Sequence, residues 1–327
     1  MLINKTHLTR IAALAVMASA SLSAHAYTLK GDAGEATIYG QIGIGYDSFK
    51  VQEEKRTDEI TVTRNSEIGL TGTIANNAPI DVKFDLRSRY KGTGGFELDR
   101  LNATFSTDIG DVVVGRAASS FDMVTRDFDK FDDHFTEDFE VGDAVRDHER
   151  LSLSRTFDNG IYVAADVAAG NSRANVGDMV SVSTKINLLE SLDFAAGYEY
   201  DETTSKSKVL NTVKQYKTGM NYQFNDKFDM GLIVNYKDFA NKEVEHLTTS
   251  VTGSYQYSDK WSFKVGVASI YEYADVDPYL TVVTRLAADY QYSKNLRGYI
   301  GFAHNDRSDL DGGKNDFMHT LGMIYDF

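Results

Sequence analysis

Apolar residues recur at every second position through most of the chain from residue 35 onward. Residues 80–90 are the plainest case, because every odd position is charged and every even position except Ser88 is aliphatic or aromatic. A period of two is that of a β-strand with one apolar and one polar face. Sixteen segments follow this period, at residues 35–46, 61–75, 80–90, 96–107, 111–118, 148–157, 160–169, 179–189, 192–201, 209–224, 227–240, 245–257, 260–273, 279–292, 295–306 and 316–327. The alternation therefore predicts an all-β chain.

The segment at residues 260–273 is longer than the strands of a soluble sandwich, which usually have about five or six residues. Its apolar face has aromatic residues at both ends and aliphatic residues between them, in the order Trp261, Phe263, Val265, Val267, Tyr271 and Tyr273. Ten residues separate Trp261 from Tyr271. At about 3.3 Å per residue and a tilt of about 40°, they cover roughly 25 Å, which is the height of the apolar band of a membrane barrel.

A repeated stretch marks three tight turns. Residues 222–228 (YQFNDKF), 255–261 (YQYSDKW) and 290–296 (YQYSKNL) are near copies, 33 and 35 residues apart, so the period is one hairpin. The connections on the other side are longer, at residues 47–60, 170–177, 203–208, 274–278 and 307–315. Short turns on one rim and long loops on the other predict a transmembrane antiparallel up-and-down β-barrel of sixteen strands.

The first 26 residues have the features of a secretory signal peptide. Lys5 and Arg10 precede an apolar run at residues 11–22, and Ala24-His25-Ala26 is a small-residue cleavage site. We expect cleavage after Ala26, which leaves a barrel domain at residues 27–327. Losing two basic residues and no acid changes the net charge from −14 to −16. Such acidity argues against binding nucleic acid, and the absence of cysteine excludes disulfides.

Residues 119–147 are the one long segment that departs from the alternation. They hold ten Asp or Glu residues against three Lys or Arg residues. At helical spacing one face carries apolar residues, namely Val124, Phe128, Phe131, Phe135 and Phe139. The other face carries acids, namely Asp129, Asp133, Glu137 and Glu140. The pattern predicts one or two turns of amphipathic helix that pack against a wall and present an acidic edge, although a solvated surface loop stays open.

Basic residues lie on the polar faces of the neighbouring strands. Alternation places Lys83, Arg87 and Arg89 inside the barrel, and it does the same for Arg100 and Arg150 if their leucine neighbours face lipid. Each arginine could instead form an ion pair with an acid such as Asp81 or Asp85, with no effect on permeation.

The sequence resembles the general porins of Gram-negative outer membranes along nearly all of its mature length. The resemblance rests on TIYGQ at 37–41, IGLTG at 68–72, DVVVGR at 111–116, FDMV at 121–124 and YDF at 325–327. It implies a homotrimer of sixteen-stranded channels whose third loop, here residues 119–147, folds into the lumen and narrows it. Acids on that loop would face basic residues of the opposite wall.

The resemblance also implies roles for single residues. The loop's turn at 139–143 places Glu140 at the constriction, with Phe139 where the family has proline. Strict alternation puts Arg116 in phase with Val112 and Val114, whereas the resemblance places it in the channel through a bulge or a strand end at Gly115. The C-terminal Tyr325 and Phe327 resemble the signal by which such barrels are recognised for assembly. Glu67 stands where a basic residue is frequent, which favours cations.

We therefore expect an outer-membrane porin for passive diffusion of small hydrophilic solutes and ions, with a mild preference for cations. No enzyme motif or cofactor is expected, the histidines are scattered, and only loose divalent binding at residues 127–133 stays open. The expected partners are outer-membrane lipid and lipopolysaccharide, the barrel-assembly machinery and two further copies, although the loop at 91–95 is short for latching a trimer. The alternatives are an oligosaccharide-selective channel and a plugged-barrel adhesin or receptor.

Overall fold

The computed structural model describes residues 27–50, 57–62, 66–75, 80–90, 95–131, 135, 147–169, 176–204, 210–240, 244–274, 279–307 and 314–327. The strands within these ranges are β1 (Tyr27–Gly31), β2 (Gly34–Lys50), β3 (Thr57–Val62), β4 (Glu67–Ile74), β5 (Asp81–Tyr90), β6 (Phe96–Thr107), β7 (Gly110–Ala118), β8 (Asp147–Thr156), β9 (Tyr162–Ala169), β10 (Val176–Leu189), β11 (Leu192–Thr204), β12 (Leu210–Asn225), β13 (Phe228–Phe239), β14 (Val244–Gln256), β15 (Trp261–Ala274), β16 (Tyr279–Ser293), β17 (Leu296–Arg307) and β18 (Lys314–Asp326). Between β7 and β8 lie the short helices α2 (Ser120–Met123) and η2 (Arg126–Phe128).

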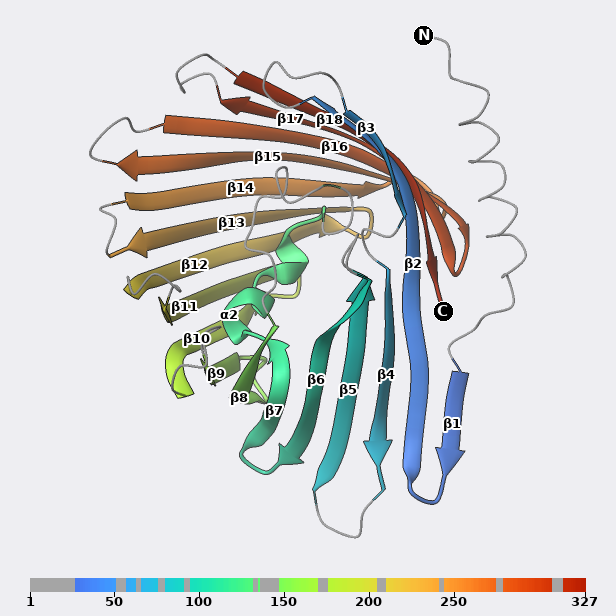
Figure 1. The fold of residues 1–327 in the computed structure, drawn as a ribbon, viewed down its shortest axis with the longest axis vertical. Helices are drawn as coiled ribbons and strands as arrows, with labels where there is room; N and C mark the ends of the chain where they lie inside the picture. The colour runs from blue at the N-terminus through green and yellow to red at the C-terminus, as the bar shows by residue number, and fades with distance from the viewer. Residues whose placement is uncertain are drawn as a thin grey trace.

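The strands form a closed antiparallel barrel of sixteen strands (Figure 1). From β4 to β18 each strand pairs with the next one in the chain, and β2 pairs with β4 on one edge and with β18 on the other. The predicted all-β barrel and its strand number are confirmed.

Two details of the strand pattern differ from the sequence expectation. The expected second strand at 61–75 corresponds to β4, while β3 begins at Thr57 in the expected loop and includes only the first two residues of the expected strand. β3 and β4 pair with successive parts of the same edge of β2. β2 itself extends to Lys50, into the expected loop. In addition, β1 pairs with residues Gly34 to Ile38 of β2 on the edge that β18 occupies further along. At five residues, β1 is too short for the alternation to identify.

The last residue of the chain completes the seam between the two ends of the barrel. Gly40 N donates to the Phe327 carbonyl, and Phe327 N donates to the Gly40 carbonyl, both at 2.9 Å. The Phe327 ring lies over the bare Cα of Gly40, where a Cβ would come within 2.5 Å of the ring. Backbone pairing therefore continues to the C-terminus.

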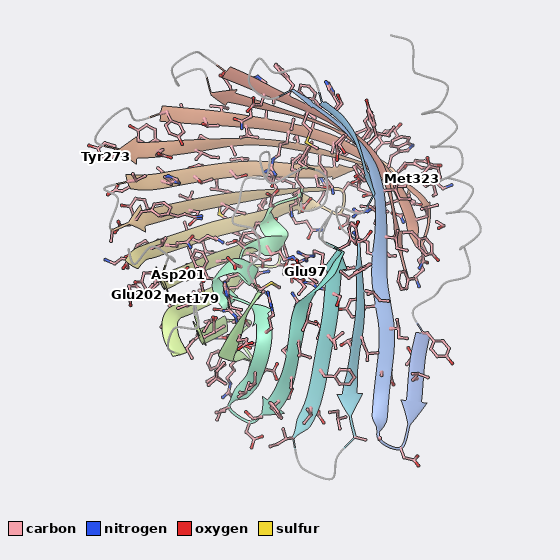
Figure 2. The ribbon with its side chains drawn as sticks, in the orientation of Figure 1. Glu97, Met179, Asp201, Glu202, Tyr273 and Met323 are labelled. Carbon is pink, nitrogen blue, oxygen red and sulfur yellow. The ribbon has the colours of Figure 1, made fainter. Side chains whose placement is uncertain are left out.

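The two faces of the wall have opposite chemistry. The alternating residues of β15 from Trp261 to Tyr273 are exposed on the outer face, and Val265 is 50% exposed. Figure 2 shows Tyr273 near the end of β15. It also shows Asp201 of β11 beside Met179 of β10, its register partner, and both side chains are buried. Many side chains of the inner face are polar or charged, and many are buried, together with apolar residues such as Met179. Among the described residues, no helix has the length and apolar character needed to cross a membrane.

Candidate functional site

The segment that follows β7 is fixed to the wall at its first residues. Ser119 caps α2, because its Oγ accepts from Asp122 N at 2.9 Å. Ser120 N donates to the Asp166 carboxylate at 3.0 Å, and the same carboxylate pairs with Arg150. Arg150 Nε also donates to the Ala117 carbonyl at 2.7 Å. The Arg150 and Asp166 side chains are fully buried, so Arg150 anchors the start of the segment and presents no guanidinium to open solvent.

Of the helical turns that the sequence predicts, the described residues of the segment form two short and separate ones, α2 and η2. α2 ends at Met123, η2 is a single turn, and Asp129 is already extended with φ −81° and ψ 127°. The apolar phase is nevertheless right, because Val124, Phe128, Phe131 and Phe135 are all buried. Carboxylates four residues apart disfavour a helix, whereas an extended chain can follow the wall and bury each ring in turn. Phe139 lies outside the described residues.

Each phenylalanine in the described part of the segment lies over a glycine of the inner wall. A Cβ on Gly219 of β12 would come within 2.7 Å of Phe128, one on Gly266 of β15 within 2.8 Å of Phe131, and one on Gly301 of β17 within 3.0 Å of Phe135. A Cβ on Gly231 of β13 would overlap the carbonyl oxygen of Phe128. That oxygen instead accepts from Thr252 Oγ1 on β14 at 2.9 Å. The described part of the segment therefore follows the inner wall from β9, where α2 begins its contacts, to β18.

Charged side chains of the segment pair with the wall beneath it. Lys185 lies 3.9 Å from Asp127, Lys217 lies 3.9 Å from Asp122, and Arg285 lies 3.3 Å from Asp129. In the opposite sense, Lys130 of the segment pairs with Asp229 on β13 and donates to Asn221 Oδ1 at 2.9 Å. Sequence reasoning missed these wall residues because alternation assigns a face to a side chain without saying what covers it. Only contacts between residues that are distant in the sequence identify them.

The arginines of β5 and β6 make their ion pairs within the wall. Arg87 lies 2.5 Å from Asp99 and 3.4 Å from Glu67, and Arg89 lies within 3.7 Å of the same two acids. Arg100 lies 3.3 Å from Asp85, whose other oxygen accepts from Tyr39 at 2.7 Å. Lys83 is exposed on the same inner face near the rim, where it lines a depression with Asp81. For these arginines the sequence left two roles open, a basic filter or local ion pairs. The contacts seen here are local ion pairs.

Arg116 lies on a different face from the arginines of β5 and β6. It is in register with Leu101 on β6 and Glu149 on β8, and Leu101 is exposed on the outer face. Gly115 has φ +120°, but its pairing shows no register shift, so there is no bulge to turn Arg116 inward. The expected placement in the channel therefore does not hold for Arg116.

The remaining candidates are located as follows. Asp133, Glu137 and Glu140 lie outside the described residues. Tyr325 is outward-facing, pairs with Ile42 and stacks on Phe327 with ring centroids 6.5 Å apart. In the described part of the chain, no group of three or more His, Asp or Glu side chains is arranged to hold a metal ion.

Comparisons with known proteins agree with this architecture. The sequence profile of the family described as Gram-negative porin matches residues 12–310. No curated protein matches the sequence. The structure is similar to the anion-selective porin from Comamonas acidovorans, with a TM-score of 0.77 and 13% identity over 90% of this chain and 100% of that chain. It is also similar to the outer-membrane channel DcaP of Acinetobacter baumannii, with a TM-score of 0.75 and 10% identity over 93% of this chain and 100% of that chain. The trimer form of OmpT, an outer-membrane protein of Vibrio cholerae, gives a TM-score of 0.70 and 16% identity over 90% of this chain and 100% of that chain.

Proposed function

The chain belongs to the Gram-negative porin family and is a β-barrel of the outer membrane, and on this premise we propose that it forms a water-filled channel with a mild preference for cations. Small hydrophilic solutes and ions would cross it by passive diffusion. The observation that carries this proposal is the division of the wall into an apolar outer face and a polar, charged inner face. A water-filled lumen would supply the solvent that such an inner face needs.

The path of the segment supports a partly open lumen rather than a plug. Its described residues contact the wall between β9 and β18, and Met123, Arg126 and Asp127 of the segment remain exposed. We propose that residues 119–147 narrow the channel from this side, facing the side formed by β2 to β8. A selective sugar channel would call for a ladder of inner aromatic residues, and the inner face here carries mainly charged and amide groups.

The cation preference would come from the excess of acids in the sequence of the segment. Arg87, Arg89 and Arg100 each have a carboxylate partner within the wall. Residues 132–147 hold seven acids, among them Asp133, Glu137 and Glu140, against Arg146 as the single basic residue. Charges in a narrow channel with low-dielectric walls are screened less than surface charges, so a small excess biases ion flux.

The remaining parts of the proposal concern processing and assembly. Residues 1–26 lie outside the described residues, and we propose that they are a signal peptide. The trimer form of the similar OmpT supports a homotrimer for this chain as well. We further propose contacts of the outer face with lipid and lipopolysaccharide, and recognition of Tyr325 and Phe327 by the barrel-assembly machinery. The protein would act as a channel without cofactor or catalysis.

The test is the reversal potential of refolded residues 27–327 in a planar bilayer under a KCl gradient. We expect a cation-favouring potential that shrinks in the variant Asp133→Asn, Glu137→Gln, Glu140→Gln. A control variant neutralises Asp108, Asp158 and Asp226, which are exposed in the short turns, and removes the same charge away from the segment. An unchanged potential in the first variant would place its acids outside the ion path, and a wild-type protein without conductance would favour a plugged barrel.

A further inference from the structure

Three basic residues of the inner wall repeat one arrangement. Lys185 on β10, Lys217 on β12 and Arg285 on β16 each pair with an aspartate of the segment. Each also lies over a phenylalanine ring of the segment, at 5.3 Å for Lys185 and Phe128, 4.2 Å for Lys217 and Phe121, and 4.6 Å for Arg285 and Phe131. A cation within about 6 Å of a ring centroid is attracted to the face of the ring. The segment is thus held at three successive points by a charge and a ring together.

Arg285 makes the most complete of these contacts. Its terminal nitrogens lie 3.3–3.4 Å from the Asp129 carboxylate oxygens, and the residue is only 1% exposed. Asp129 Oδ1 also accepts from Phe131 N at 3.0 Å, which fixes the carboxylate to the backbone of the segment. A buried guanidinium without a carboxylate is strongly unfavourable, so Arg285 and the segment depend on each other. The planar guanidinium suits a carboxylate and a ring at once, which an ammonium group does not.

We propose that Arg285 is the positioning residue that holds the segment on the wall, and that it removes the charge of Asp129 from the ion path. Asp129 therefore contributes to the position of the segment rather than to cation preference, in contrast to Asp133, Glu137 and Glu140. The inference rests on the proposed channel function and deepens it. It distinguishes the acids that would attract cations from Asp129, which would hold the segment in position.

The test compares Arg285→Met, Asp129→Asn and the double variant. Because the chain has no cysteine, Met123→Cys gives a single site for a spin label on the exposed side of α2. In all three variants the immobile component of the label's spectrum should decrease, although α2 keeps its own contacts with Asp166 and Lys217. The reversal potential should shift toward cations in Arg285→Met and toward anions in Asp129→Asn, because each variant leaves the charge of one partner uncompensated. In the double variant neither charge remains, so its potential should lie between those of the two single variants. Arg285→Lys should keep the potential and lose part of the immobilisation.

The matched control is Lys264→Met, because Lys264 is a basic residue of the same wall that pairs with Asp289 of the wall at 3.1 Å. It should leave the label immobile. If Arg285→Met does not refold, Asp129→Asn and Phe131→Leu still test the same contact from the side of the segment. An immobile label in folded Arg285→Met or Asp129→Asn would overturn the proposal. A wild-type barrel that does not conduct would instead refute the channel function, while the label would still decide the positioning role.

Discussion

The glycines of the inner wall determine where the segment can lie. Gly219, Gly231, Gly266 and Gly301 each leave a space that a ring or a carbonyl of the segment occupies. At Gly231 the occupant is backbone, which cannot rotate away as a side chain can. A single methyl group at this position would therefore act on the segment rather than on the strand that carries it.

We predict that Gly231→Ala displaces Phe128 while the barrel still folds. Overpacking of this kind costs about 1–3 kcal/mol, and the segment can relieve it by leaving the wall. Thr125→Cys, buried beside Phe128, should then react faster with a small maleimide. The control Gly253→Ala adds a methyl group that meets its nearest neighbour at 3.5 Å, an ordinary contact. Equal reaction rates in the two variants would show that Gly231 does not seat the segment.

At the scale of the element, the strands were predictable because each one faces two different environments. The outer face of β15 and β16 is mainly apolar and the inner face is more polar, so polarity alternates along most of each strand. β1 escaped prediction because five residues are too few to show a period, and the interruption between β3 and β4 leaves no mark in that period.

The segment was predictable in its apolar residues and not in its backbone. The spacing of Val124, Phe128, Phe131 and Phe135 identifies the residues that are buried, because they must meet the wall. The same spacing also suggests a helix, because a helix and a chain that follows a curved surface can bury side chains at similar intervals. Lys185, Lys217 and Arg285 come from strands far along the sequence, and only the closed barrel brings them beneath the segment.

We predict that the C-terminal residue stabilises the barrel apart from any role as a recognition signal. Deletion of Phe327 removes two backbone hydrogen bonds to Gly40, each worth about 1 kcal/mol, together with the contact of its ring. Phe327→Leu keeps the backbone bonds and should lose less. The measurement is the urea midpoint after refolding in detergent without assembly factors. A deletion variant as stable as the wild type would leave recognition as the only role of Phe327.

For the whole molecule, the important property is that the buried ion pairs lie on one side of a closed wall. Three inner ion pairs are examples, namely Arg87 with Asp99, Lys264 with Asp289 and Arg285 with Asp129. Because each charge has a partner of opposite sign nearby, the free-energy cost of burying these charges is reduced. The outer face of β15 carries none over its exposed apolar residues. The channel proposal therefore requires that lipid and water meet opposite faces of the same strand.

This division predicts different effects for one new charge on the two faces of β15. Val265→Arg places a guanidinium in the apolar band and should cost about 2–4 kcal/mol near the bilayer midplane. Ser262→Arg faces inward, in register with Asp289, and should cost far less because the new charge meets a carboxylate and water. The folded fraction in lipid vesicles across a urea series measures both. If Ser262→Arg were the more damaging variant, lipid would have to cover the charged face, and the barrel would not be a water-filled channel.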